Sequence, residues 1–347
     1  MSNILIKDSS SPLFQDSLVY RPFHYMWAQT MFQEHEKIHW IPGEAQMQDD
    51  HEDWANNLTE DEKKFIKLIF AVFTTGDVVV AKNYKKCFLT KYENNEASNL
   101  LMSIAAREAI HQEAYALAAE IFNMDDSIFA AFHEYKEMKE RLEGMFFNFD
   151  CDTVDQLAIN HAHSVIDEGV GLFGVFVSLL QFMRRDKVAF NGKRGGRLKG
   201  FSKINAWSLR DETLHTDANV KFFQQLTYEH PIVNDKFKKE IYELNRRFIQ
   251  VEDTFLDRAH RALQLDTFSL DENKAYMRFM SNRRMVQMGL KPEFTEITTN
   301  PCSWIDPILT ENKVSSFFET KVSSYQVDGA IVGKFDLNEM LALGQKF

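Results

Sequence analysis

The most regular feature of the chain is a series of apolar positions that recur with the spacing of an α-helix. A capping box, Thr59 followed by Glu62, predicts the start of a long helix that runs toward Tyr84. The same period predicts helices over residues 97–122, 127–144, 153–183, 201–226, 234–265 and 270–288. The glycine-rich segment 190–200 lacks this period and predicts a basic surface loop. The pattern therefore predicts an all-α fold.

The C-terminal part of the chain changes character after Gly289. Residues 291–307 contain three prolines with turn-forming Thr and Asn, and polar, serine-rich sequence follows. In the final segment, 334–347, apolar residues are spaced among polar ones, which is typical of a segment that folds against a partner's groove. We expect one helical domain over residues 1–320 and a flexible docking tail over residues 321–347.

Composition narrows the class of protein. Hydrophobic residues make up 44% of the 347 residues, and only 14 Gly and 7 Pro argue against a turn-rich all-β or disordered chain. The formal charge of −11 disfavours nucleic-acid binding. The longest apolar stretch, 169–183, is shorter than the ~20 residues that cross a bilayer, and the N-terminus shows no export signal. We therefore expect a cytoplasmic protein with no membrane span.

Acidic residues and histidines recur on the predicted helices in the order carboxylate, Glu-x-x-His, carboxylate, Glu-x-x-His. On a helix the glutamate and histidine of each motif share a face, so each motif can chelate one metal ion. Two such helices, with one carboxylate from each of two others, give the dimetal site of ferritin-like bundles. Hard carboxylate oxygens with only two imidazoles favour Fe or Mn over structural zinc. The six predicted ligands are Asp77, Glu108, His111, Glu168, Glu212 and His215.

Sequence context separates these six residues from two similar motifs. The six lie in apolar surroundings, where ionised groups are costly unless they are paired or bound to metal. The motifs at residues 36–39 and 257–260 are instead predicted to be solvated helix faces. Arg107 and Arg210, which precede the two Glu-x-x-His motifs, can pair with part of the acidic charge.

A tyrosine is predicted on the metal-facing side of the first motif's helix. Tyr115 follows His111 by four residues and Glu108 by seven. Alone it would be an ordinary core residue, but beside a redox-active dimetal site it is an oxidisable group. Leu172 and Phe176, four and eight residues after Glu168, are predicted to keep its surroundings dry.

These residues together resemble the small, radical-generating subunit of class I ribonucleotide reductase, from about Trp40 to the C-terminus. The stretches RRMVQMGLKPEF and NPCSWI and the sequence Ser323-Ser324-Tyr325 resemble the same family. The resemblance implies that the six residues bind a dinuclear metal centre and that Tyr115 stores the radical. Iron is favoured as the metal, and manganese or a mixed Mn/Fe centre stays open.

The resemblance also implies a route for the radical. Asp211 would link a metal-bound histidine to Trp40, and Tyr325 in the tail would pass the radical to the large subunit. That subunit would reduce ribonucleotides to deoxyribonucleotides, and the tail would dock on it. A homodimer is also expected.

Two other functions fit part of the sequence. A ferritin-like dimetal oxidase or hydroxylase acting on a small apolar substrate would use the same ligands but has no need of a docking tail. A metal-storage protein would use internal acids as an entry site for iron, yet storage gives no role to Trp40, Asp211 or Tyr325. The sequence therefore favours the reductase subunit.

Overall fold

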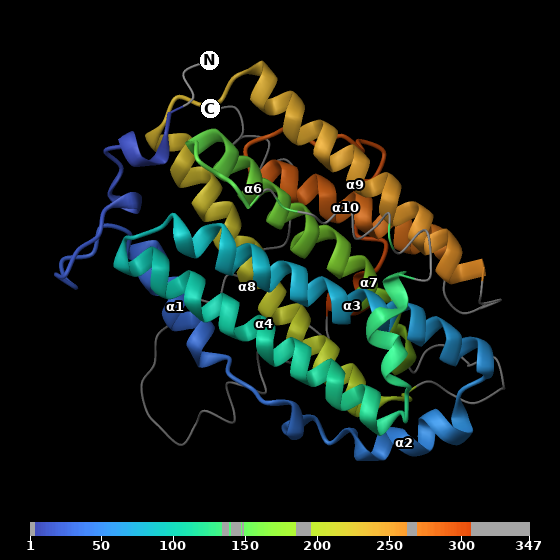
Figure 1. Ribbon diagram of the computed structural model, residues 1–347. Coiled ribbons are helices and arrows are strands. Elements are labelled where there is room, and N and C mark those ends of the chain that lie inside the picture. The colour runs from blue at the N-terminus through green and yellow to red at the C-terminus, as the bar shows by residue number, and fades with distance from the viewer. Residues whose placement is uncertain are drawn as a thin grey trace.

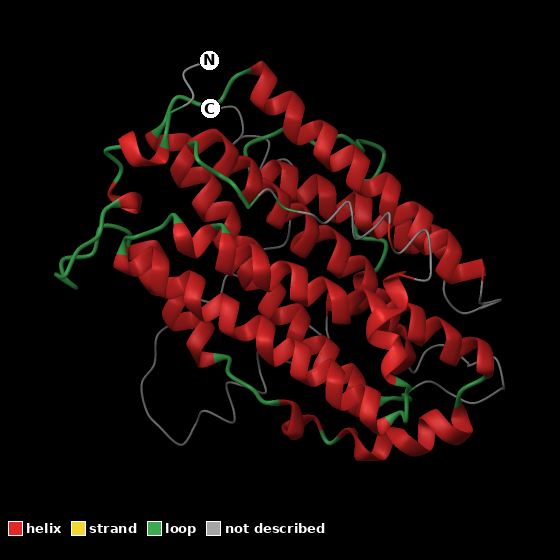
Figure 2. Cartoon of the chain, in the orientation of Figure 1, coloured by secondary structure: helices red, strands yellow, loops and turns green. Residues whose placement is uncertain are grey.

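The computed structural model describes residues 4–133, 139, 147, 149–184, 196–261 and 269–306. Within these ranges the regular elements are all helical, which confirms the all-α prediction (Figures 1 and 2). The described α-helices are α1 (Met26–Lys37), α2 (Asp50–Glu52), α3 (Glu60–Lys86), α4 (Asn95–Ile121), α6 (Val154–Ile166), α7 (Leu172–Leu180), α8 (Lys199–Glu229), α9 (Asp235–Arg261) and α10 (Leu270–Gln287).

The starts of the long helices follow from local sequence. The Thr59 hydroxyl accepts the Glu62 N–H at 3.1 Å, and the Glu62 carboxylate accepts the Thr59 N–H at 2.8 Å, so the predicted capping box is confirmed. Thr153 and Gln156 form the same arrangement at the start of α6. The Asn94 side chain caps α4 by accepting the N–H of Ala97.

Residues 154–183 form one helical rod that includes a π-helical turn at Asp167–Gly171. The rod is long and apolar enough to cross a membrane, but its most apolar window is entirely buried inside the protein, so it is a core helix. Gly169 permits close packing in the π turn, because a Cβ there would lie 2.6 Å from atoms of both Thr216 and Arg284. The π turn therefore packs tightly against α8 and α10, next to Glu168.

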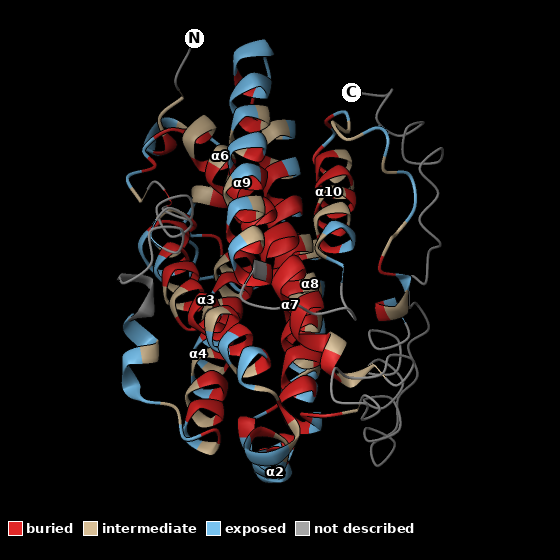
Figure 3. Cartoon of the chain, turned by 90° about the vertical axis from the view of Figure 1, so that its right-hand side faces the viewer, coloured by how far each residue is buried: buried red, intermediate tan, exposed pale blue. Residues whose placement is uncertain are grey.

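A central bundle consists of α3, α4, the α6–α7 rod and α8. Helix α3 packs on α4 and α7, while α8 packs on α4, α6 and α7. Helix α1 covers α4 and α8, and α9 and α10 cover the rod from outside (Figure 1). Figure 3 shows buried residues concentrated on α7 and α8, whereas α9 carries exposed residues along its outer side.

The core of this bundle divides into two apolar clusters along its length. The first contains Phe73, Tyr115, Leu172 and Leu209, which belong in order to α3, α4, α7 and α8. The second contains Val80, Leu101, Val165 and Ala218, from α3, α4, α6 and α8. On each central helix the predicted ligands lie between the residues of these two clusters. Charged groups therefore occupy a narrow layer between two apolar regions.

The structure corrects three predictions from the sequence, and it contains one helix, α1, that the sequence did not predict. The described start of the predicted 127–144 helix is a 3₁₀ helix, Asp126–His133, whose first turn Asp125 caps by accepting the Ser127 N–H at 2.9 Å; the remainder lies largely outside the described residues. Helix α1 was not predicted, although Ala28 is buried and Trp27, Met31 and Phe32 pack against the second apolar cluster.

The second and third corrections concern charge and burial. Arg197, expected on a basic surface loop, is buried and pairs with both oxygens of Glu62, at 2.9 and 2.7 Å; residues 190–195 of that segment lie outside the described ranges. His260, expected on a solvated face, is buried edge-on against Phe65 because that side of α9 faces the core. His39 is exposed, as predicted, but it lies beyond the end of α1 at Lys37 and not on a helix face.

Candidate metal centre

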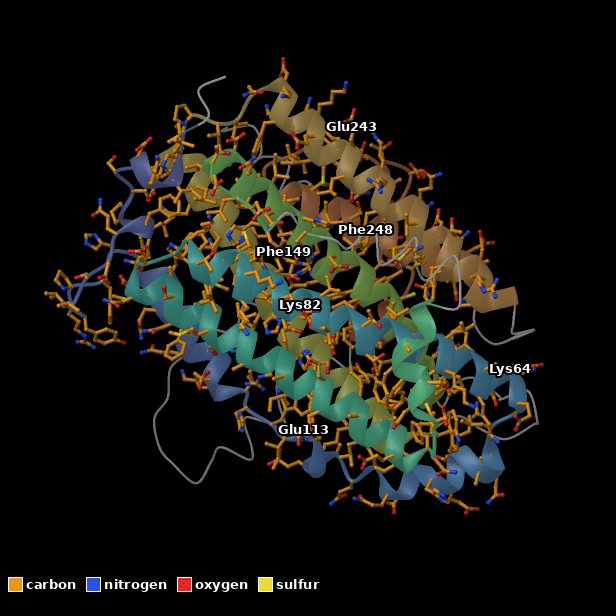
Figure 4. The ribbon with its side chains drawn as sticks, in the orientation of Figure 1. Lys64, Lys82, Glu113, Phe149, Glu243 and Phe248 are labelled. Carbon is orange, nitrogen blue, oxygen red and sulfur yellow. The ribbon has the colours of Figure 1, made fainter. Side chains whose placement is uncertain are left out.

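The four central helices bring all six predicted ligands into one cluster. Each of the six side chains is at most 1% exposed. Asp77, Glu108 and His111 can offer ligand atoms that lie within 4.8 Å of one another, and Glu108 forms a second such group with Glu168, Glu212 and His215. By contrast, Glu113, which is on α4 like Glu108, is exposed (Figure 4).

Two glutamates lie between the two histidines. Glu108 places Oε1 at 3.0 Å from His215 Nδ1 and Oε2 at 3.6 Å from His111 Nδ1. Glu212 places Oε1 at 3.3 Å from His111 Nδ1 and Oε2 at 3.2 Å from His215 Nδ1. Each glutamate therefore directs one oxygen to each imidazole, so both glutamates could serve metal ions held at either histidine.

The remaining two carboxylates each belong to one side. Asp77 groups with His111, whereas Glu168 Oε2 lies 3.8 Å from His215 Nδ1. We call Asp77 and His111 the first half of the centre, and Glu168 and His215 the second half. Each half holds one imidazole nitrogen and one carboxylate, and the two glutamates are shared.

The cluster is electrostatically arranged to attract positive charge. Burial raises the pKa of both Asp77 and Glu168. Burial also acts to raise the pKa of Glu108, but the adjacent imidazoles His111 and His215 outweigh it and lower the value to about 2. Burial alone would lower the pKa of His215, yet the carboxylates of Glu212 and Glu108 raise it to about 10. Protons on the histidines therefore balance carboxylate charge that metal ions would otherwise balance.

The donor atoms fit a pair of metal ions. Asp77 Oδ2, both oxygens of Glu108 and Glu212 Oε1 are buried and receive no aligned hydrogen bond from the described residues. Unsatisfied buried acceptors are costly, and metal ions would satisfy them. Four carboxylates and two imidazoles are the donor set of dimetal carboxylate proteins. The cluster can therefore hold a dinuclear metal centre.

A charged group lies behind His111. Asp211 Oδ2 accepts hydrogen bonds from Trp40 Nε1 at 2.7 Å and from His111 Nε2 at 3.2 Å. The Trp40 and His111 rings are also stacked, with centroids 5.9 Å apart. Arg107 and Arg210 lie 3.6 and 3.8 Å from the Asp211 carboxylate. Burial acts to raise the pKa of Asp211, but His111 and the two arginines lower it, so this aspartate stays ionised.

A neutral group lies behind His215. His215 Nε2 is 3.0 Å from Nε2 of His35, a buried residue of α1. His35 Nδ1 is in turn 2.6 Å from the Ser103 hydroxyl, which donates to Glu36 at 2.5 Å. Burial, with His215 beside it, lowers the pKa of His35 to about 3.

Glu168 in the second half has two hydrogen-bond donors. The Tyr84 hydroxyl lies 3.0 Å from Oε2 and 3.2 Å from Oε1 of Glu168. Asn219 Nδ2 donates to the Tyr84 hydroxyl at 2.7 Å and lies 3.4 Å from Glu168 Oε1. Beyond Asn219, its Oδ1 contacts His161 Nδ1 at 2.8 Å, and Tyr92 contacts His161 Nε2 at 2.7 Å.

Tyr115 lies in the first apolar cluster. Its ring stacks on Phe73 at 4.7 Å, and Phe70 meets it edge-on at 5.7 Å. Its hydroxyl donates to Asn205 Oδ1 at 3.1 Å. Leu172 and Phe176 are buried in the same cluster, with Phe176 4.8 Å from Phe73. Tyr325, the remaining predicted site residue, lies outside the described residues.

Sequence reasoning missed the four polar residues around the second half, His35, Tyr84, His161 and Asn219. A signal existed for three of them. Tyr84 follows Asp77 by seven residues, Asn219 follows Glu212 by seven, and His161 precedes Glu168 by seven, which is the spacing that singled out Tyr115. No sequence signal connects His35 with His215, which is 180 residues away.

Comparisons with known proteins point to one family. Residues 17–301 match the model of the family described as ribonucleotide reductase, small chain. The probable ribonucleoside-diphosphate reductase small subunit of Invertebrate iridescent virus 3 is 33% identical over 332 residues, covering 90% of this chain and 85% of the viral protein. The ribonucleoside-diphosphate reductase subunit beta of Chlamydia pneumoniae is 27% identical, covering 89% of this chain and 90% of that protein.

Solved structures share the fold. A putative class I ribonucleotide reductase from Bacillus halodurans superposes with a TM-score of 0.73 at 20% identity, covering 82% of this chain and 99% of that one. The dimanganese(II)-NrdF protein of Streptococcus sanguinis has a TM-score of 0.72 at 17% identity, covering 86% of this chain and 99% of that one. The predicted ferritin-like helical fold is therefore confirmed.

Proposed function

The chain belongs to the ribonucleotide reductase small-chain family, and from that premise we propose how its buried cluster serves the reductase. Asp77, Glu108, His111, Glu168, Glu212 and His215 bind a dinuclear metal centre, and Tyr115 stores the radical. The observation that carries this proposal is the cluster itself. It holds two buried glutamates that each place one oxygen near each histidine Nδ1, and the central helices that form it also carry the aromatic surroundings of Tyr115.

The chain's own residues prepare the site for this chemistry. When bound, a redox-active metal pair supplies the oxidising power that removes one electron from a tyrosine. The Asp211 carboxylate accepts the Nε2 proton of His111, which leaves Nδ1 of that imidazole available to a metal. The phenylalanine rings around Tyr115 exclude water, so a radical there is protected from side reactions.

Trp40 and the tail provide the proposed route out of the site. Trp40 contacts Asp211 directly, and Asp211 contacts His111, so the three residues form a continuous buried link from the cluster toward α1. We propose that the radical passes along Trp40, with Asp211 managing the associated proton. Tyr325 then relays the radical while the tail, 321–347, docks on the large subunit. We also propose a cytoplasmic homodimer.

Iron is the proposed metal. The hard oxygen-rich donor set suits both Fe and Mn, and one structural neighbour is a dimanganese(II) protein. The proposal of iron therefore rests on the sequence resemblance, and manganese is the second metal to test.

The proposed function is tested by electron paramagnetic resonance. Metal-free protein loaded with Fe(II) and exposed to air should give an organic radical signal, and Tyr115→Phe should abolish that signal. Tyr276→Phe is the matched control, because it removes a hydroxyl from another buried tyrosine, on α10 outside the four central helices. Retention of the signal in Tyr115→Phe would contradict the role of Tyr115. Absence of any radical or oxidised metal signal with Fe or Mn would contradict the proposed function.

A further inference from the structure

The two halves of the cluster are matched in the atoms that face the metal positions, but they differ in what lies behind those atoms. Each half has one imidazole Nδ1, one carboxylate of its own and a share of Glu108 and Glu212. Behind His111 lies a carboxylate, Asp211, with Arg107 and Arg210 at 3.6 and 3.8 Å from it. Behind His215 lies a second imidazole, His35.

Hydrogen-bond donors determine the state of His35. If His215 binds a metal through Nδ1, its only proton is on Nε2, which must then donate. His35 Nε2, 3.0 Å away, must therefore be the acceptor and carry no proton. The His35 proton is then on Nδ1 and is donated to Ser103, whose hydroxyl donates to Glu36. A metal in the second half thus requires a neutral acceptor behind His215.

This difference bears on metal affinity. A metal-bound histidine that donates to a carboxylate becomes a more basic and stronger ligand than one that donates to a neutral group. The carboxylates of the two halves differ in the same sense. The Glu168 carboxylate accepts hydrogen bonds from Tyr84 and Asn219, which draw electron density from its oxygens. Asp77 Oδ2 receives no aligned hydrogen bond from the part of the chain that the structure describes. Both differences strengthen the first half relative to the second.

We propose that the two metal positions are unequal: the position at Asp77 and His111 binds a divalent ion more tightly, and His35 is the positioning residue that holds His215 in the weaker one. This inference rests on the proposed dimetal function. Replacing a residue behind a metal ligand changes affinity by about 10- to 100-fold, so we expect the two affinities to differ by at least about tenfold.

Anaerobic titration of metal-free protein with Mn(II) tests the inequality. The free ion is followed by electron paramagnetic resonance, and we expect two binding steps of one ion each. Crystals grown with one equivalent of Mn(II) should show anomalous scattering mainly between Asp77 and His111. Equal occupancy, or preferential filling beside Glu168 and His215, would overturn the inequality and leave the proposed function intact. Failure to bind any Mn(II) or Fe(II) would overturn both.

Substitution of His35 tests its positioning role. His35→Leu removes the acceptor and should weaken the second Mn(II) step by about 10- to 100-fold, with the first step nearly unchanged. His35→Gln keeps a neutral acceptor oxygen and should restore most of that loss. His39→Leu, an exposed histidine nearby in sequence, is the matched control.

The same variants can refute the role of His35. An equal weakening of both steps in His35→Leu would mean that the residue only supports the fold. If His35→Leu does not fold, Ser103→Ala replaces it, because it removes the hydroxyl that accepts the His35 Nδ1 proton. An unchanged second step in folded Ser103→Ala would then overturn the positioning role.

Discussion

Two buried tyrosines flank the cluster, and their surroundings are opposite in character. Tyr115 and Tyr84 each follow a candidate ligand by seven residues, and both side chains are fully buried. Tyr115 belongs to the first apolar cluster, where its ring meets phenylalanines and its hydroxyl donates to the amide oxygen of Asn205. Tyr84 belongs to the second cluster, but its hydroxyl donates to Glu168 itself. Two tyrosines at the same spacing thus differ: Tyr115 lies among aromatic rings, and Tyr84 is hydrogen-bonded to the cluster.

On the side of the cluster where Tyr84 lies, hydrogen bonds form a chain that runs in one direction. With the proton of His161 on Nδ1, Tyr92 donates to His161, His161 donates to Asn219, Asn219 donates to Tyr84, and Tyr84 donates to Glu168. Every donor then has an acceptor, so the chain fixes the Glu168 carboxylate. The Tyr84 hydroxyl is committed to hydrogen bonds with the cluster, whereas Tyr115, the tyrosine proposed to store a radical, lies among aromatic rings. Both tyrosines resist ionisation, because burial raises the pKa of each.

The largest expected effect comes from creating a cavity beside Tyr115. Phe73→Ala removes the ring stacked on Tyr115 and leaves a cavity in the core, which should cost about 3–5 kcal/mol in the free energy of unfolding. Water that enters the cavity should shorten the lifetime of the radical that we propose for Tyr115. Denaturant unfolding measures the stability, and the decay of the radical signal in folded protein measures the lifetime.

Phe73→Leu serves as the control for this change, because it keeps most of the apolar volume. It should cost less stability and leave the radical lifetime close to that of the wild type. An unchanged radical lifetime in folded Phe73→Ala would show that the phenylalanine rings do not protect Tyr115.

His161, in the hydrogen-bond chain that ends at Glu168, should make the free energy of unfolding depend on pH. Burial lowers the pKa of His161 to about 3, whereas its value in the unfolded chain is about 6.5. Between these values the unfolded state binds more protons, so this contribution to stability is fully present above pH 6.5 and is lost as the pH falls toward 3. The contribution of His161 at pH 5 should be lower by roughly 2 kcal/mol than at pH 8.

The variant His161→Gln isolates this contribution in metal-free protein. Its amide can donate to Asn219 and accept from Tyr92 without titrating. The difference in unfolding free energy between pH 8 and pH 5 should therefore be smaller in the variant by the same amount. Equal pH dependence in the two proteins would show that His161 is not held neutral by the fold.

The two tyrosines also show how far sequence alone can reach. Helical spacing placed Tyr115 on the metal-facing side of its helix, because i, i+4 and i+7 positions share one face whatever the tertiary structure. Apolar context likewise separated the six clustered residues from the exposed motif that ends at His39. Tyr84 obeys the same spacing but lacked a neighbouring motif that would draw attention to it.

Other features depend on packing between distant segments and could not be read from spacing. His35 is a polar residue on the buried side of α1, and its partner comes from α8. Arg197 sits in a sequence rich in glycine and charge, which is typical of a surface loop, yet Glu62 of α3 pairs with it in the interior. In both cases a partner far along the chain decides whether a polar residue is buried.

The smallest expected effect comes from removing the Tyr84 hydroxyl. Tyr84→Phe should lower the stability of metal-free protein by only about 1 kcal/mol, because Asn219 Nδ2 keeps the carbonyl of His215 as an acceptor at 3.0 Å. Freed from that donor, Glu168 should bind a metal more strongly, so the second Mn(II) step should tighten and the gap between the two steps should narrow. A wider gap in Tyr84→Phe would show that the hydroxyl supports metal binding instead of competing with it, and the contrast between the two tyrosines would then need a different physical basis.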